Sequence, residues 1–219
     1  MKILCVSDYI DPLVYSNAIK ERFKDIDVIL SAGDLPMEYI DFIVSSLNKP
    51  AFFVFGNHNL KEFPYYHPEV QTTRTITQKW NLSHSHGADY LGFKTARCCS
   101  LLLAGTSGSL KYNNGHAQYT EQQMTWRLIK LIPRLIFNKL RYGRYLDIFL
   151  THAAPFGISD REDPCHKGFK CFLWFMKLFK PKYLIHGHIH LYSLQDVRHH
   201  IFEETEVINV YSHYVLEIK

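Results

Sequence analysis

Two histidines near the end of the chain, His188 and His190, stand two positions apart directly after Gly187. The preceding apolar run at 183–185 has the length and composition of a buried strand, and Gly187 lets the backbone turn without a steric penalty. Residues two apart in an extended segment project to the same side, so we expect both imidazoles to serve one metal cluster. Imidazole is the commonest metal-binding side chain, although a Gly-His-x-His sequence taken alone is more typical of two surface histidines.

A polar side chain also follows an apolar run at four other places in the chain. The residues are Asp8, Asp34, Asn57 and His152. Taken singly, an aspartate can cap a helix, an asparagine can shape a turn, and His152 can be an ordinary buried histidine. Their shared position after a predicted strand favours a single site.

This set of donors predicts two divalent metal ions. Mixed oxygen and nitrogen donors suit Mn²⁺, Fe or Zn²⁺, of which we expect Mn²⁺. A carboxylate such as that of Asp34 can bridge two ions, while the amide oxygen of Asn57 is a neutral ligand that leaves positive charge available. Paired cations can neutralise an anionic phosphate ester and produce hydroxide near neutral pH, so the chemistry indicated is phosphoester hydrolysis.

Alternating strand and helix patterns must bring these residues together. In the first part of the chain, strands are predicted at residues 3–6, 28–30 and 51–55, and helices at 16–24 and 36–47. This β-α-β-α-β order with short connections predicts a parallel sheet. Ligands bind outside the carboxyl ends of the strands in open α/β sheets, which is where the polar residues stand.

The second part of the chain carries further predicted elements. Strands are expected at 90–94, 97–104, 145–150 and 183–185, a helix at 169–179, and two antiparallel strands of a second sheet at 207–211 and 214–218. The tail strands are inferred from their partial alternation of apolar and polar residues.

A long basic helix is predicted over residues 120–144, interrupted at Pro133. Thr120, with Gln123 three positions later, is typical of a capping box at its start. Arginine or lysine stands at 127, 130, 134, 139, 141 and 144. A solvated helix face is the favoured interpretation, and the alternative is peripheral contact with an anionic membrane or a phosphorylated substrate.

Length and composition suit one domain covering all 219 residues, large enough to bury a core without disulfides. The formal net charge of +4 is compatible with anionic substrates and does not indicate sequence-specific nucleic acid binding. Five cysteines, an odd number without a Cys-x-x-Cys pair, indicate a reducing compartment. The apolar run at 3–6 is too short for a signal peptide, and no apolar stretch reaches about 18 residues, so we expect no transmembrane segment and a cytoplasmic protein.

In the segments that carry its candidate metal ligands, the chain resembles the calcineurin-like metallophosphoesterase superfamily. The matching segments occur in the order Asp8, Gly33-Asp34, Gly56-Asn57-His58, His152 and Gly187-His188-Ile189-His190. The resemblance implies an α/β fold, namely a four-layer α-β-β-α sandwich of two mixed sheets flanked by helices.

The resemblance also implies roles for the individual residues. Asp8 and His190 would hold the first metal, Asp34 would bridge, and Asn57, His152 and His188 would hold the second. His58 would protonate or stabilise the leaving oxygen, so the implied catalytic residues are His58 and Asn57. The implied reaction is attack of a hydroxide shared by the two metals on a phosphomonoester or a phosphodiester.

Ile10 marks the main departure from the family pattern. The first segment is usually Asp-x-His, and Ile10 stands where that histidine would be, so the first metal site is expected to be weaker or more open. Asp11 has the wrong spacing to replace it. Asn59 stands where an acidic residue often follows Gly-Asn-His, and Glu38 lies one place later than the acidic residue that usually follows Gly-Asp. A second hypothesis is therefore a catalytically weakened or inactive binding scaffold on the same fold, while the retained His58 favours the enzyme.

Four residues in predicted loops are candidates for substrate contact. They are His86, Asn113, His116 and Arg161. Binding residues concentrate in loops, and an ordinary polar loop residue is an equally strong interpretation of each.

Overall fold

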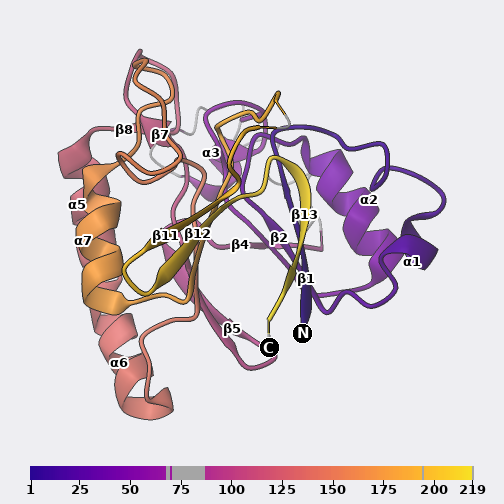
Figure 1. The fold of residues 1–219 in the computed structure, drawn as a ribbon, viewed down its shortest axis with the longest axis horizontal. Helices are drawn as coiled ribbons and strands as arrows, with labels where there is room; N and C mark the ends of the chain where they lie inside the picture. Colours follow the sequence, from indigo (N-terminus) through magenta and orange to yellow (C-terminus); the bar gives the residue numbers. More distant parts are fainter. Residues whose placement is uncertain (68–69, 71–86, 194, 219) are drawn as a thin grey trace.

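The computed structural model describes residues 1–67, 70, 87–193 and 195–218, which form two large sheets and a small ribbon (Figure 1). The first sheet contains, in spatial order, β13 (Ser212–Glu217), β1 (Lys2–Ser7), β2 (Val28–Ser31), β3 (Ala51–Phe53) and β4 (Asp89–Tyr90). The second contains β11 (His199–Phe202), β12 (Thr205–Asn209), β10 (Tyr183–His186), β9 (Ile148–Leu150), β6 (Leu101–Gly105) and β5 (Lys94–Cys98). The ribbon pairs β7 (Ser109–Leu110) with β8 (Gln118–Tyr119).

Both large sheets are mixed. In the first sheet β1, β2, β3 and β4 run parallel, as the β-α-β-α-β pattern predicts, and β13 joins β1 antiparallel. In the second sheet β12, β10, β9 and β6 run parallel, and β11 and β5 are antiparallel edge strands. The parallel strands of each sheet therefore end at a common edge, where ligands bind in α/β folds.

Helices cover the outer faces of the two sheets (Figure 1). On the first sheet lie α1 (Ile19–Arg22) and α2 (Met37–Leu47), and on the second lie α5 (Glu121–Ile129), α6 (Ile132–Tyr142) and α7 (Lys170–Phe179). The short α3 (Phe63–Tyr66) follows β3. Helices, sheet, sheet and helices make four layers, which confirms the predicted fold class.

The side chains of β1 show how the layers are held together. Leu4 and Val6 belong to the core beneath α1 and α2, while Ile3 and Cys5 belong to the core between the two sheets. All four are completely buried. A strand with a core on each face must be apolar at every position, which explains the unbroken apolar run at the start of the chain.

The predicted helix 120–144 is two helices, α5 and α6. The break falls ahead of Pro133 rather than at it, and Pro133 lies in the first turn of α6, where its missing N–H costs no hydrogen bond. At the start of α5, the Thr120 hydroxyl accepts from Gln123 N at 3.2 Å, and the Gln123 side chain accepts from Thr120 N at 2.9 Å. The predicted capping box is confirmed.

The prediction of one strand at 97–104 is wrong. The segment forms a hairpin in which β5 ends at Cys98 and β6 begins at Leu101. Cys99 between them has a left-handed backbone with φ of 53°, which no strand can continue. Two adjacent cysteines carry no sequence signal for such a turn.

The prediction that both tail strands are antiparallel strands of a second sheet is also wrong. β12 joins β10 in the second sheet, and β13 crosses over to β1 in the first. The antiparallel partner of β12 is β11, which was not predicted because half of it is histidine. Apolar patterning predicts strands and not their partners.

Several predicted elements differ in extent from the structure. The helix at 16–24 is reduced to α1, and the strand at 145–150 is reduced to β9. The predicted strand at 90–94 is not continuous, since β4 ends at Tyr90 and β5 begins at Lys94. Ala18 is the N-cap residue of α1, and it has no side-chain oxygen that could accept a hydrogen bond from the backbone N–H groups of the first turn. The helix therefore lacks a stabilising cap at its start. Among the described residues, no helix combines the length and the apolar character needed to span a membrane.

Candidate metal centre

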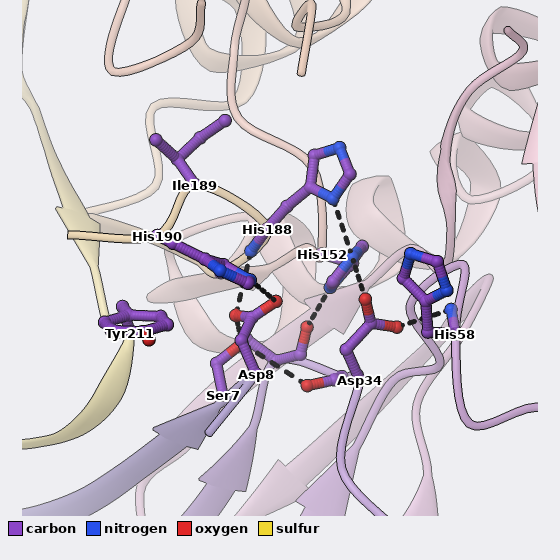
Figure 2. A network of polar contacts seen from close by, with 12 residues as sticks. Ser7, Asp8, Asp34, His58, His152, His188, Ile189, His190 and Tyr211 are labelled. Atoms are coloured by element: carbon purple, nitrogen blue, oxygen red, sulfur yellow. Dashed lines mark hydrogen bonds and ion pairs between the residues drawn. The ribbon is translucent and has the colours of Figure 1, made fainter. Parts of the chain in front are cut away.

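Side chains from both sheets converge at the carboxyl ends of parallel strands (Figure 2). Asp8, Asp34 and Asn57 follow β1, β2 and β3 of the first sheet. His152 and His188 follow β9 and β10 of the second sheet. The site is therefore built across the two sheets, and neither sheet alone carries it.

The contacts of this cluster centre on His152 Nε2. It lies 3.1 Å from Asn57 Oδ1, 3.1 Å from His188 Nδ1 and 3.4 Å from Asp34 Oδ2. Single donor atoms of Asp34, His152 and His188 all lie within 4.8 Å of one another. The side chains are buried, so water does not separate the donor atoms.

Hydrogen bonds to backbone carbonyls fix which nitrogen each histidine presents. His152 Nδ1 donates to the Ala32 carbonyl at 2.8 Å, and His188 Nε2 donates to the Cys165 carbonyl at 2.7 Å. When both imidazoles are neutral, the nitrogens that face each other therefore carry lone pairs. Two lone pairs 3.1 Å apart, beside a carboxylate and an amide oxygen, repel unless a proton or a metal cation lies among them. This donor set fits a divalent metal ion.

The titration behaviour of the cluster also favours added positive charge. Although burial works against charging His152, the carboxylates of Asp34 and Asp8 raise its pKa to about 9. Burial, followed by repulsion from His152, lowers the pKa of His188 to about 3. For Asp34, burial is outweighed by His152 and by the His58 N–H, which lower its pKa to about 2. The cluster thus holds an ionised carboxylate that attracts a cation.

Asp8 and His190 form a second part of the site. Asp8 Oδ2 accepts from His188 N at 2.9 Å, while Asp8 Oδ1 is buried without a hydrogen-bond partner among the described residues. His190 Nε2 lies 3.8 Å from that oxygen. The Tyr211 ring packs on the His190 ring with centroids 4.8 Å apart, and Tyr192 Oη lies 2.6 Å from His190 Nδ1. An unpartnered buried carboxylate oxygen beside an imidazole nitrogen also fits a cation.

Three of these residues have a left-handed backbone. The φ angle is 64° at Asp8, 58° at Asp34 and 66° at His188. Such conformations cost of order 1–3 kcal/mol each away from glycine and concentrate at functional sites. The expectation of an extended segment at His188 is therefore wrong. The turn directs its ring to His152, while His190 lies beside Asp8.

Gly56 and Gly187 lie where the acidic side chains pass close to the backbone. A Cβ at Gly56 would overlap the Asp34 carboxylate. A Cβ at Gly187 would overlap the Ser7 hydroxyl and the Asp8 carboxylate, which are themselves hydrogen-bonded. Glycine is required at both positions for space rather than for its backbone freedom.

His58 lies at the rim of the site with an exposed side chain (Figure 2). Its N–H donates to Asp34 Oδ1 at 2.7 Å, and the Asn59 side-chain amide donates to the Asp34 carbonyl at 2.9 Å. Glu38 pairs with Lys61 at 3.4 Å. The loop that carries His58 is thus anchored on Asp34, and Asn59, at a position where the family usually has an acid, contributes to that anchor.

Ile10 is 40% exposed beside the Asp8 part of the site. The next residue, Asp11, is engaged elsewhere, since its carboxylate accepts from Ser212 Oγ at 2.5 Å, from His213 Nδ1 at 2.5 Å and from Leu13 N at 2.8 Å. These bonds attach the segment after β1 to β13. Asp11 therefore has a structural partner set of its own.

The four candidate substrate residues lie in different surroundings. Arg161 donates to the His190 carbonyl at 2.7 Å and borders an open cavity of about 480 Å³. Asn113 Oδ1 accepts from Gly115 N and from the Gln118 side chain, both at 2.7 Å. His116 is exposed in the same loop, and His86 lies outside the described residues.

Sequence reasoning missed three contributors to the site. Tyr112 accepts a hydrogen bond from the Asn57 side chain at 3.1 Å, the Cys165 carbonyl fixes the His188 tautomer, and Tyr211 packs on His190. Tyr112 stands in the turn-rich loop that was expected to contact a substrate, and its contact with Asn57 was not predicted. A backbone carbonyl and a packed ring leave no signal in the sequence.

Comparisons with known proteins identify a matching family and similar folds. The family model described as calcineurin-like phosphoesterase matches residues 1–192. The crystal structure of TT1561 of Thermus thermophilus matches with a TM-score of 0.64 at 16% identity, covering 96% of this chain and 89% of that one. The phosphopantetheinyl hydrolase PptH from Mycobacterium tuberculosis matches with a TM-score of 0.50 at 12% identity, covering 96% and 88%. At these identities both structures support the fold alone, and no curated protein matches.

Proposed function

The chain belongs to the calcineurin-like phosphoesterase family, and from that premise we propose that it is a metal-dependent phosphohydrolase acting on a phosphomonoester or a phosphodiester. The observation that supports this most directly is the meeting of lone-pair nitrogens and oxygens at His152. These donor atoms are stable at such short distances only with a positive charge among them, which a divalent cation supplies in place of a proton on His152.

We propose two divalent metal positions, with Mn²⁺ as the expected ion. Asp34, Asn57, His152 and His188 would hold one ion, and Asp8 and His190, with Asp34 in common, would hold the other. The second of these has no ligand from Ile10, so its affinity should be the lower one. When bound, such cations neutralise an anionic phosphate and acidify water near neutral pH.

The residues of the chain would divide the remaining work. His58, whose exposed ring lies next to Asp34, would give a proton to the leaving oxygen, a role suited to imidazole. Arg161 would place a cationic guanidinium at the rim, beside His190, where a phosphoryl group or its substituent enters. Asn113, His116 and His86 remain candidates for substrate contact from the loops.

The hypothesis can be tested with the metal-depleted protein and added MnCl₂. We expect hydrolysis of an aryl phosphomonoester or an aryl phosphodiester, and the preferred one identifies the substrate class. His58→Ala should lower turnover by about 10²–10⁴-fold while the number of bound ions stays the same. His199→Ala, which alters an exposed histidine of β11 paired with Glu206, is the matched control and should keep its activity.

The alternative is a binding scaffold on the same fold, favoured by the missing histidine at Ile10. It predicts no turnover on either substrate class with any divalent metal, and at most one bound ion per chain. That result would overturn the hydrolase proposal and leave the fold assignment intact.

We also propose that the protein acts in the cytoplasm and touches a membrane through residues 120–144. Between positions 122 and 146 the sequence has six Arg or Lys residues and no Asp or Glu. Large apolar side chains stand among these cations, with Trp126 65% exposed and Leu140 83% exposed. Exposed apolar groups among cations are complementary to a bilayer with anionic headgroups.

Vesicle sedimentation tests this contact. Vesicles containing phosphatidylserine should retain the protein, neutral vesicles should not, and added salt should weaken the binding. Leu140→Asp should lower binding by about tenfold or more, whereas Leu178→Asp, at a 55% exposed position of α7, is the matched control. Equal binding by both variants, or binding only to nucleic acid, would overturn the membrane proposal.

A further inference from the structure

The side chain of Asn57 is held at both of its ends. Its oxygen Oδ1 lies 3.1 Å from His152 Nε2, within the candidate metal centre. Its nitrogen Nδ2 donates to the hydroxyl of Tyr112 at 3.1 Å. Asn57 is only 8% exposed, so water does not readily replace Tyr112 as the acceptor for the amide hydrogens.

The direction of this amide decides what it can bind. A carboxamide has one oxygen, which accepts, and one nitrogen, which only donates. Only the orientation with oxygen toward His152 presents a ligand to a cation, while the flipped orientation presents two positive N–H groups. The partner of the nitrogen end is therefore as important for metal binding as the oxygen itself.

Tyr112 belongs to a loop that is built to hold it. Gln118 Oε1 accepts from Tyr112 N and from Asn113 N, both at 3.2 Å. The Gln118 amide in turn donates to Asn113 Oδ1 at 2.7 Å. These three bonds close the turn between β7 and β8 on itself and fix the backbone from which the Tyr112 side chain extends.

The base of this loop is attached to the segment that carries Asn57. Gly108 N donates to the Phe55 carbonyl at 2.7 Å, and Phe55 N donates to Ser107 Oγ at 3.0 Å. Phe55 is two residues before Asn57. The hydroxyl of Tyr112 and the amide of Asn57 are therefore placed by one connected set of hydrogen bonds.

From this arrangement we propose that Tyr112 is a positioning residue, which turns the carboxamide oxygen of Asn57 toward the metal centre. The proposal rests on the proposed metal-dependent function. Tyr112 touches no metal in this scheme, and its effect passes through the amide. Residues that orient a metal ligand through a hydrogen bond commonly contribute about 10–100-fold to metal affinity.

Calorimetric titration with MnCl₂ tests the proposal without an activity assay. Tyr112→Phe removes the hydroxyl and keeps the ring, and we expect the affinity of the tighter site to fall by about 10–100-fold. Tyr145→Phe is the matched control, because Tyr145 precedes β9 at the end of the strand opposite His152. Its affinity for Mn²⁺ should equal that of the unaltered protein.

Tyr112→Phe in an Asn57→Asp variant distinguishes positioning of the amide from a structural contribution of Tyr112 to its loop. Asn57→Asp places a carboxylate at the same position, which presents an oxygen in either orientation and has no need of a hydroxyl to orient it. In that background Tyr112→Phe should change the affinity by less than about threefold. A merely structural role would give the same loss in both backgrounds.

The outcomes are distinguishable. If the unaltered protein binds no Mn²⁺, the proposed function fails first. If it binds Mn²⁺ and Tyr112→Phe binds equally well, the positioning role is wrong while the metal centre stands. The positioning role is also wrong if Tyr112→Phe lowers the Mn²⁺ affinity equally with asparagine and with aspartate at position 57.

Discussion

Asp8, Asp34 and His188 present their side chains to the site from a backbone that residues with a Cβ rarely adopt. Each lies one to three residues beyond the end of a strand, where the chain turns. The strain is tolerated because neighbouring bonds hold it, such as that from His188 N to Asp8 Oδ2. At the scale of the residue, the site depends on a few closely fitted atoms.

Gly56 tests that fit most directly. Gly56→Ala places a methyl group on the Asp34 carboxylate, which must then move out of the cluster. We expect a loss of about 1–3 kcal/mol in the free energy of unfolding together with a loss of Mn²⁺ affinity. Thermal unfolding and calorimetric titration measure the two quantities.

Gly143→Ala is the control for this substitution. Its φ is 77° and an added Cβ there meets nothing within 4 Å, so it should cost stability through the backbone alone. Its metal affinity should be unchanged. If Gly56→Ala binds Mn²⁺ as tightly as the unaltered protein, the backbone of Gly56 does not lie against the Asp34 carboxylate.

Asp11 gives the protein a pH-dependent contribution to stability. Burial acts to raise its pKa, but hydrogen bonds from Ser212, His213 and Leu13 N outweigh burial and lower it. A carboxylate with a lowered pKa in the folded state stabilises fully above its ordinary pKa near 3.9, and the contribution is lost as pH falls through the folded value.

Asp11→Asn should therefore lose stability mainly at neutral pH. We expect a deficit of about 1.5–3 kcal/mol near pH 7, shrinking below pH 4 as the unaltered protein loses its own contribution. Denaturant unfolding from pH 7 to pH 3 measures the difference. A deficit that stays constant over this range would show that the charge of Asp11 is not what stabilises the fold.

At the scale of the element, the sequence predicted the chemical types of the ligands better than their geometry. The strands before Asp8, Asp34, Asn57, His152 and His188 could be predicted because each is a short apolar run ended by a polar residue or glycine. The left-handed turns could not, because aspartate and histidine do not require that conformation. The hairpin at Cys99 and the partners of β12 and β13 were missed because both depend on contacts between distant segments.

The start of α5 offers a test at this scale. Thr120 and Gln123 satisfy each other's backbone N–H groups, and Glu121 in the first turn accepts from Lys170 N at 3.2 Å at the start of α7. Thr120→Ala should cost about 1 kcal/mol in the free energy of unfolding, and Thr120→Ser should restore most of it. Equal stability of the three proteins would show that the cap contributes nothing to the fold.

At the scale of the whole molecule, the two sheets meet in a core and again in the site. Ile3 and Cys5 of β1 pack in one core with Leu150 of β9 and Ile185 of β10. The polar residues that follow these strands converge beyond that core. The layers could be predicted from the order of strands and helices, together with the family resemblance, because burial of both faces of a sheet requires helices on its outer side.

Because the candidate ligands come from both sheets, a bound cation should join them. Any ligand that binds the folded state alone stabilises it by about 2.7 kcal/mol at a hundredfold excess over Kd. For a chain of this length such a gain corresponds to a rise in Tm of roughly 5–10 °C. Thermal unfolding of the metal-depleted protein, with and without MnCl₂, measures the shift.

His188→Ala is the variant that decides whether the shift comes from this site. It removes one of the two donors that the second sheet gives to the cluster, and leaves His152 of that sheet and Asp34 and Asn57 of the first sheet in place. The Mn²⁺-dependent rise in Tm should fall by more than half, because the loss of one ligand lowers the affinity on which the stabilisation depends. If the rise persists unchanged in His188→Ala, the stabilising ion lies elsewhere and the centre at His152 is not the metal site.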